Sequence, residues 1–571
     1  TKQFYSEIQN WYFWAMDKVE FPDDEEKDKE KRNAKNLIRM ITRIIFIWFM
    51  KAQKLIPSEI FDKQFIDKIL NYQDKTDSTY YKAILQNLFF ATLNTPMKNE
   101  KNKDEAPSRT FVDEAQKRGY ISDGYLQHGF YRYKRFIKDV DTFLKTFENI
   151  PFLNGGLFDC LDKKVDGKEI RIDCFSDNPK NETRLKVPDE LFFLDKEITV
   201  NLSKYLEKGT NKKVTGLFEI LNKYNFTIDE NTPIDQEVAL DPELLGKVFE
   251  NLLAAYVPET ATTARKATGS YYTPREIVDY MVDESLTEYL IQKMIEGARS
   301  YVIIGSDQTD AFGNEGRKGQ LKLVECLTPK KWLDKEKKLK EEIRKLLSYE
   351  DEATAFNDED KKILIKAIED IKILDPACGS GAFPMGILHK LVLVLHKLDP
   401  ENKIWKEQMI NKVPPEIREE TKQSLENKPL DYIRKLGLIE NCIYGVDIQE
   451  IAIQISKLRF FISLLVEQVP DDTKPNRDIK ALPNLETKFV AANSLISIEK
   501  PSQMEIKNPK VEELENELFK VRQEIFYSNS RWKKVELQKR EKNLREKLKE
   551  ALSRMLSLSL VEVERTLIAL F

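Results

Sequence analysis

The sequence predicts an α/β domain in the second half of the chain, preceded by a mostly helical region and followed by a helical hairpin. Three observations predict this arrangement. One apolar run is followed by a glycine-rich turn near residue 375, and a second apolar run ends in an acid near residue 447. Elsewhere apolar residues recur every three or four positions. Such a pattern is typical of a parallel sheet covered by helices, which binds ligands at the carboxyl ends of its strands.

Composition indicates a large globular protein of several domains. The chain has 571 residues, of which 41% are hydrophobic and 33% charged. We expect a mostly helical region with a small irregular or β excursion at 1–238, the α/β domain at 239–500 and the hairpin at 501–571. The longest apolar stretch, 37–50, is too short to span a bilayer and carries two arginines, so it predicts a buried core helix. A cytoplasmic protein with reduced cysteines and no zinc is expected, because no signal peptide and no CxxC pair occurs.

The first element of the α/β domain is a strand, a glycine turn and a helix. Residues 371–374 are an apolar strand, Asp375 stands at its tip, and the helix runs from Ala382 to about Leu398. Gly379 and Gly381 lack a Cβ, so the backbone can turn tightly and approach a ligand. A carboxylate at Asp375 repels a pyrophosphate but can hold a cationic amine, which favours S-adenosylmethionine over a dinucleotide.

The second element is the strand 441–447, which ends in Asp447 and is followed by a helix to about Glu467. Asp447 can accept both hydroxyls of a ribose. It lies much further from the glycine turn than the usual distance of about 20 residues, because a polar helical insertion at 399–436 intervenes. A role as helix N-cap suits Asp447 equally well and stays open.

The segment Asp-Pro-Ala-Cys-Gly-Ser-Gly-Ala-Phe at 375–383 resembles the first motif of amino-methylating DNA methyltransferases, especially the adenine-N6 group of type I and type II restriction-modification systems. The resemblance implies a Rossmann-like domain that binds S-adenosylmethionine. It assigns cofactor binding to the turn residues Asp375, Pro376, Ala377, Cys378, Gly379, Ser380 and Gly381, and to Asp447 and Ile448 on the second strand.

Two further segments resemble motifs of the same family. Gly-Ser-Tyr-Tyr-Thr-Pro at 269–274 resembles the motif that closes over the methionine end of the cofactor, through Tyr271, Tyr272, Thr273 and Pro274. Locally it predicts a helix start with Thr273 as N-cap and Pro274 at the first helical position. Residues 488–496 resemble the third motif, with Asn493 where many members carry Asp, and a simple turn residue is the alternative there. The segment 154–158 (NGGLF) resembles the helical N-terminal region of large type II, or type IIG-like, methylase-nuclease polypeptides.

The family's catalytic loop, Asn-Pro-Pro-Tyr or a close variant, is not found in the sequence. Catalytic residues are therefore unassigned, and we expect a fragment truncated before that loop. The strand at 371–374 is then expected at an open sheet edge, with marginal stability or pairing with another chain as the consequence.

Charge leaves the mode of DNA binding open. The resemblance implies double-stranded DNA with a flipped adenine as the substrate, yet the formal net charge is −4. Either a missing C-terminal target-recognition domain or specificity subunit supplies the basic surface, or positive charge is segregated locally, for example near 531–534 and 539–540. A protein or RNA methyltransferase and a non-catalytic cofactor-binding scaffold remain alternatives. The nearest nuclease-like pattern, Asp310 with 320–322, lacks the usual glutamate.

Overall fold

The structure, a computed structural model, describes residues 2–72, 78–97, 109–117, 128–153, 156–165, 167–206, 209–226, 239–240, 273–306, 329–350, 356–413, 415–426, 428–495, 509–527 and 531–556. The chain divides into two compact units. The first comprises Thr1–Tyr272, Gly379–Gly381 and Asp447–Phe571, and the second comprises Thr273–Cys378 and Ala382–Val446.

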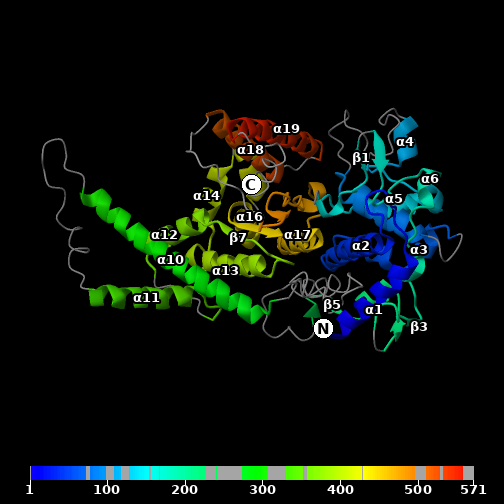
Figure 1. The fold of residues 1–571 in the computed structure, drawn as a ribbon, viewed down its shortest axis with the longest axis horizontal. Helices are drawn as coiled ribbons and strands as arrows, with labels where there is room; N and C mark the ends of the chain where they lie inside the picture. The colour runs from blue at the N-terminus through cyan, green and yellow to red at the C-terminus, as the bar shows by residue number, and fades with distance from the viewer. Residues whose placement is uncertain are drawn as a thin grey trace. The chain divides into compact units, whose positions relative to one another are not determined.

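The N-terminal part of the first unit is mostly helical, as the sequence predicts (Figure 1). Its helical segments are α1 (Lys2–Lys18), α2 (Lys29–Ala52), η1 (Ser58–Phe61), α3 (Lys63–Ile69), the π-helix η2 (Tyr81–Thr92), α4 (Val112–Lys117), η3 (Lys134–Phe136), α5 (Val140–Glu148), η4 (Gly156–Phe158), α6 (Pro179–Glu182), η5 (Asp189–Leu191) and α7 (Leu217–Asn222).

Helix α2 forms the centre of this part. Asp28 caps its N-terminus by accepting a hydrogen bond from the Lys31 N–H, and all residues from Leu37 to Met50 are buried. The prediction of a buried core helix is therefore confirmed. None of the helices in the described part of the chain is long and apolar enough to cross a membrane.

The small β excursion expected after residue 154 is also present. Strands β1 (Lys163–Val165) and β2 (Lys168–Ile170) form an antiparallel hairpin with Lys163 opposite Ile170. Two more pairs follow: β3 (Ile198–Asn201) with β4 (Asn211–Val214), antiparallel, and β5 (Asn225–Phe226) with β6 (Ala239–Leu240), parallel.

The second unit contains the strand and the helix that the sequence predicts before and after the glycine turn, while Gly379–Gly381 belong to the first unit. Its elements are α10 (Arg275–Ser306), α11 (Pro329–Leu347), α12 (Asp358–Asp370), β7 (Ile373–Asp375), α13 (Ala382–Leu398), α14 (Lys403–Lys412), α15 (Pro415–Leu425), α16 (Leu430–Asn441) and β8 (Ile443–Asp447). Strands β7 and β8 pair in parallel, with Ile373 opposite Ile443. The predicted helical insertion lies between them as α14, α15 and the start of α16.

The strand order of the sheet that contains them is β7-β8-β9, with β9 at Phe489–Ala491. Among the described strands β7 therefore lies at an edge, and the Leu374 side chain is 60% exposed. The chain is thus a helix-rich protein with small sheets, which is compatible with a methyltransferase. A complete Rossmann-like sheet is not seen among the described residues and stays a proposal.

Two lysines of α13 fix the end of α11 in the second unit. The Lys397 ammonium donates to the carbonyls of Lys345, Leu346 and Ser348, and the buried Lys390 ammonium donates to the Leu347 carbonyl. The last carbonyls of a helix have no partner within the helix, so these cations satisfy them. Helix α11 is thereby anchored on α13.

The C-terminal part of the first unit holds α17 (Glu450–Leu465), the turn η8 (Pro475–Asp478), α18 (Pro509–Tyr527) and α19 (Arg531–Leu556). Helices α18 and α19 lie side by side (Figure 1) and share an apolar core of their own, as the predicted hairpin requires. That core is built from Val511, Leu518, Val521, Ile525, Leu537, Leu544 and Leu548.

Candidate functional site

The glycine turn between β7 and α13 has the backbone that the sequence predicts. Gly379 has φ 53° and Gly381 has φ 85°, both in the left-handed region that a Cβ disfavours. A Cβ on Gly381 would also lie 3.0 Å from the Ser456 Oγ. The glycine at 381 is therefore needed for its backbone angle and for its close approach to α17.

Asp447 contacts this turn directly. Its Oδ2 accepts a hydrogen bond from the Gly379 N–H at 2.9 Å, and its Oδ1 accepts from the Gln449 N–H at 2.8 Å. Its backbone carbonyl accepts from the Ala492 N–H after β9. The structure therefore brings together two residues that lie 68 positions apart in the sequence.

The hydrogen bond that the Gln449 N–H donates to the Asp447 carboxylate resembles the helix N-cap role, which is the alternative function of this acid. Gln449 precedes α17 and makes no side-chain cap, so the Asp447 carboxylate closes the turn that leads into the helix. Each carboxylate oxygen carries one hydrogen bond here, and a carboxylate has about four acceptor sites in all. Asp447 can consequently hold the turn and still accept from a ligand.

Sequence reasoning missed two residues of α17 that hold the other side of the turn. The Ser456 Oγ donates to the Gly379 carbonyl at 2.9 Å, and Arg459 donates to the Ser380 carbonyl at 3.1 Å. Both side chains are buried, at 0% and 2% exposure. The spacing of three between them, which puts a serine and an arginine on one face of α17, was the available signal, and it does not name the glycine turn as their partner.

Helix α2 contacts the start of α17 through a pair of cations. Arg39 and Lys35 lie 3.1 and 2.7 Å from the two carboxylate oxygens of Glu450, three residues after Asp447. Burial by itself raises the pKa of Glu450, but these two cations outweigh it and hold that pKa below its usual value. The N-terminal helical part thereby fixes the start of α17, three residues after Asp447.

Asp375 shapes the start of the turn in the second unit. Its Oδ1 accepts a hydrogen bond from the Ala377 N–H at 3.1 Å, and the side chain is half-buried. The Cys378 N–H donates to the Val446 carbonyl, which joins the turn to β8. Asp375 is thus positioned by its own loop.

The upstream motif is described only in part, since Tyr271 and Tyr272 lie outside the described residues. The predicted cap at Thr273 is wrong by one position. Helix α10 begins at Arg275, and the Pro274 carbonyl accepts from the Ile277 and Val278 N–H groups. Pro274 therefore occupies the cap position, where its lack of an N–H costs no helical hydrogen bond.

Asn493 lies just after β9 and is exposed. Its Oδ1 accepts a hydrogen bond from the Leu495 N–H at 3.0 Å, which makes it a turn residue in this structure. Ile448, the residue after the strand acid, is 67% exposed. An apolar side chain beside Asp447 is thereby open to a flat ligand.

A groove in the second unit does not include the predicted site residues. It has a volume of about 600 Å³ and is lined by α10, the edge strand β7 and α13, including Leu286, Leu374 and Phe383. Lys372 also lines it, and burial lowers the pKa of that ammonium group.

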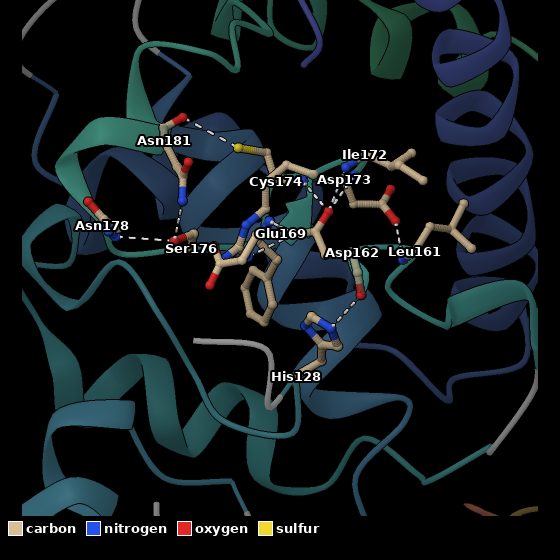
Figure 2. Close-up of polar contacts among 12 residues, drawn as sticks. His128, Leu161, Asp162, Glu169, Ile172, Asp173, Cys174, Ser176, Asn178 and Asn181 are labelled. Atoms are coloured by element: carbon tan, nitrogen blue, oxygen red, sulfur yellow. Dashed lines mark hydrogen bonds and ion pairs between the residues drawn. The ribbon is translucent and has the colours of Figure 1, made fainter. Parts of the chain in front are cut away.

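A second polar cluster, in the N-terminal part, has a structural explanation. Figure 2 shows the Asp162 carboxylate, which accepts from the backbone N–H groups of Ile172, Asp173, Cys174 and Phe175 at 2.7 to 3.0 Å. The Arg171 guanidinium adds a fifth donor at 3.3 Å. Five donors exceed the about four acceptor sites of a carboxylate, so no capacity remains for a metal ion.

Metal binding finds no other support in the described part of the chain. No group of three or more His, Cys, Asp or Glu side chains there could hold a metal ion. His396 is exposed, and its Nδ1 lies 3.4 Å from the Arg434 guanidinium, a cation that disfavours a second one nearby. The nuclease-like pattern at Asp310 and 320–322 lies outside the described residues.

Comparisons with known proteins find two similarities. Residues 441–551 match the model of the Eco57I restriction-modification methylase family. The chain is also 25% identical over 480 residues to a protein of Methanocaldococcus jannaschii whose name assigns it provisionally as a type II restriction enzyme and methyltransferase. That alignment covers 83% of this chain and 28% of the relative, so the chain spans about a quarter of the relative's length. No solved structure matches the chain.

Both findings are similarities to restriction-modification methylases. The segment similar to the Eco57I methylase family includes β8 with Asp447, the helix α17, β9, α18 and α19 as far as residue 551.

Proposed function

We propose that this chain is the cofactor-binding part of an adenine-N6 DNA methyltransferase that uses S-adenosylmethionine. The observation that carries the proposal is the hydrogen bond from the Gly379 N–H to the Asp447 carboxylate. It joins a glycine turn that can approach a ligand closely to an acid that can accept from ribose hydroxyls. A nucleoside ligand needs both features at one place.

The residues present fit this cofactor. Asp447 keeps acceptor sites for a ribose, and the exposed Ile448 next to it offers an apolar surface to an adenine ring. A side chain on Gly381 would clash with Ser456, so the turn keeps its backbone open. Asp375 carries the negative charge that suits the cationic amine of the methionine end.

The reaction proposed for the complete enzyme is a direct methyl transfer. S-adenosylmethionine supplies a methyl group activated by its positively charged sulfur. The exocyclic amine of a flipped adenine attacks the methyl carbon as the carbon–sulfur bond breaks, and the amine then loses one proton to solvent or a nearby base. The residues of this chain bind and orient the donor for that step.

The residues that hold the adenine are not assigned, because the sequence has no Asn-Pro-Pro-Tyr loop. We propose that a loop of that kind and a target-recognition domain or specificity subunit complete the enzyme on double-stranded DNA. A scaffold that binds the cofactor without catalysis is a second candidate. A protein or RNA target is the remaining alternative for the transfer.

Calorimetric titration of the chain with S-adenosylmethionine tests the proposal, and NAD⁺ serves as the control ligand. We expect saturable binding of S-adenosylmethionine alone, weakened in Asp447→Asn and unchanged in Asp471→Asn, which alters an exposed turn elsewhere. Absence of binding, or equal affinity for NAD⁺, overturns the proposal. Tritium transfer from the cofactor to DNA, RNA or protein by the complete enzyme separates the catalytic alternatives, and no transfer to any of them favours the scaffold.

A further inference from the structure

The α18–α19 hairpin carries more positive charge than its own ion pairs use. Helix α19 has ten lysines and arginines against four glutamates, a surplus of six positive charges, whereas the whole chain has a net charge of −4. The partner helix α18 has three basic and five acidic residues. Positive charge is therefore concentrated on one helix of the pair.

Part of that charge stabilises the hairpin. Arg522 pairs with Glu541 at 3.0 Å, and Arg540 pairs with Glu517 at 2.8 Å, both across the two helices. The apolar core of the hairpin comes from α18 and α19 alone. The hairpin thus has its own core and its own ion pairs.

Three cations of α19 take no part in this. Lys539, Lys542 and Arg545 are exposed and form no ion pair with any described residue. Relative to the buried Leu537, Leu544 and Leu548, the helical repeat of 100° per residue puts Lys539 and Lys542 on the opposite side and Arg545 on the flank. The three are spaced by three residues, so they form a ridge about 9 Å long that runs from the outer side of α19 onto its flank.

We propose that this ridge contacts the DNA phosphate backbone. The inference rests on the proposed function, since it takes DNA as the substrate. Lysine and arginine bind phosphates without reading sequence, and a ridge of this length reaches about two phosphates of one strand. Lys539, Lys542 and Arg545 lie within the segment that matches the methylase family, which begins before the Asp447 strand and ends at residue 551. The ridge supplies the local positive charge that an otherwise acidic DNA-modifying chain requires.

The test measures DNA affinity of the chain as a function of salt. Fluorescence anisotropy with a labelled 30-base-pair duplex is recorded at several KCl concentrations for the unaltered chain and for the triple variant Lys539→Gln, Lys542→Gln, Arg545→Gln. We expect affinity to fall about tenfold or more at low salt. The slope of log affinity against log salt should shrink by about two, close to one unit for each phosphate that the variant no longer neutralises.

A matched control replaces three exposed lysines on other elements, Lys31, Lys164 and Lys168, by glutamine. Affinity and salt slope should stay unchanged in that control. An equal loss in both triple variants, or no loss in the α19 variant, overturns the inference, as does absence of DNA binding at low salt. Salt-sensitive self-association that the α19 variant abolishes, without any change in DNA binding, would assign the ridge to the acidic α18 of a second copy instead.

Failure of this inference is distinguishable from failure of the proposed function. Calorimetry with S-adenosylmethionine reports the cofactor site and should give the same affinity in the α19 variant as in the unaltered chain. Intact cofactor binding with unchanged DNA affinity refutes the ridge alone. Absence of cofactor binding refutes the proposed function.

Discussion

Replacing Gly386 by alanine should destabilise the packing of α10 on α13, although alanine is the better helix former. A Cβ at position 386 would lie 2.6 Å from the Val278 Cγ1, about 1 Å closer than an ordinary carbon contact of about 3.5 to 4.0 Å. Val278 is buried and its branched side chain has few alternative rotamers. The two helices must therefore separate or shift along each other.

The magnitude follows from two opposing terms. Alanine for glycine within a helix stabilises by about 1 kcal/mol. Overpacking of a well-packed contact costs about 1 to 3 kcal/mol. The packing term is the larger because the new Cβ would overlap a branched side chain that is buried. We therefore expect a net loss of about 1 kcal/mol in local stability.

Hydrogen exchange of peptides from α10 and α13 measures this local stability without requiring global two-state unfolding. Val278→Ala supplies the matched background, since it removes the clashing methyl group. In that background Gly386→Ala should slow exchange instead of accelerating it, by the helix-propensity term alone. If Gly386→Ala slows exchange equally in both backgrounds, the close approach of the helices is refuted. Cofactor affinity should fall in the single variant, because α10 begins directly after Thr273 and Pro274.

Three further outcomes are expected from the first unit. Arg43→Met removes the guanidinium that lies 2.8 Å from the buried Asp173 carboxylate. Because that carboxylate is left without its cation, urea unfolding should show a free energy of unfolding lower by about 3 to 5 kcal/mol. A decrease below about 1 kcal/mol contradicts this. In Asp447→Asn one of the two accepting oxygens becomes an NH2 group, which cannot accept a hydrogen bond. Calorimetry should therefore show a binding free energy for the cofactor weaker by about 1 to 3 kcal/mol. Unchanged affinity argues against Asp447 as a cofactor-binding residue. For Glu450 the pKa is lowered in the folded state, so its contribution is present above the usual value of 4.5 and is lost as pH falls through the folded value. Glu450→Gln should therefore unfold more easily than the unaltered chain at pH 7, by less than about 1 kcal/mol because the carboxylate is half-exposed. The difference should shrink as the pH falls below 4.5, and a difference that does not depend on pH refutes the ion-pair origin.

Local elements followed closely from the sequence. The helix after the glycine turn spans Ala382–Leu398, as the apolar run indicated, and the second strand ends at Asp447. The two helices of the hairpin appear on either side of 528–530. These features depend on backbone angles and on periodicities within one segment, which the sequence carries directly.

Contacts between distant segments did not follow from the sequence. Nothing in the composition of α17 shows that Ser456 and Arg459 donate to the carbonyls of the glycine turn. The same holds for Arg43, which donates to the carbonyls of Leu157 and Asp159. Such pairings depend on which helix faces meet, and many pairings satisfy the same apolar pattern.

By itself, then, the sequence determined the glycine turn, the two acids at strand ends and the charge of the hairpin, because each depends on neighbouring residues and on residue type. Tertiary structure alone decided that the Asp447 carboxylate binds the Gly379 N–H, and which cations of α19 stay unpaired. The physical reason is that hydrogen bonds and ion pairs act over about 3 Å, and only the packing of the helices brings such groups within that range.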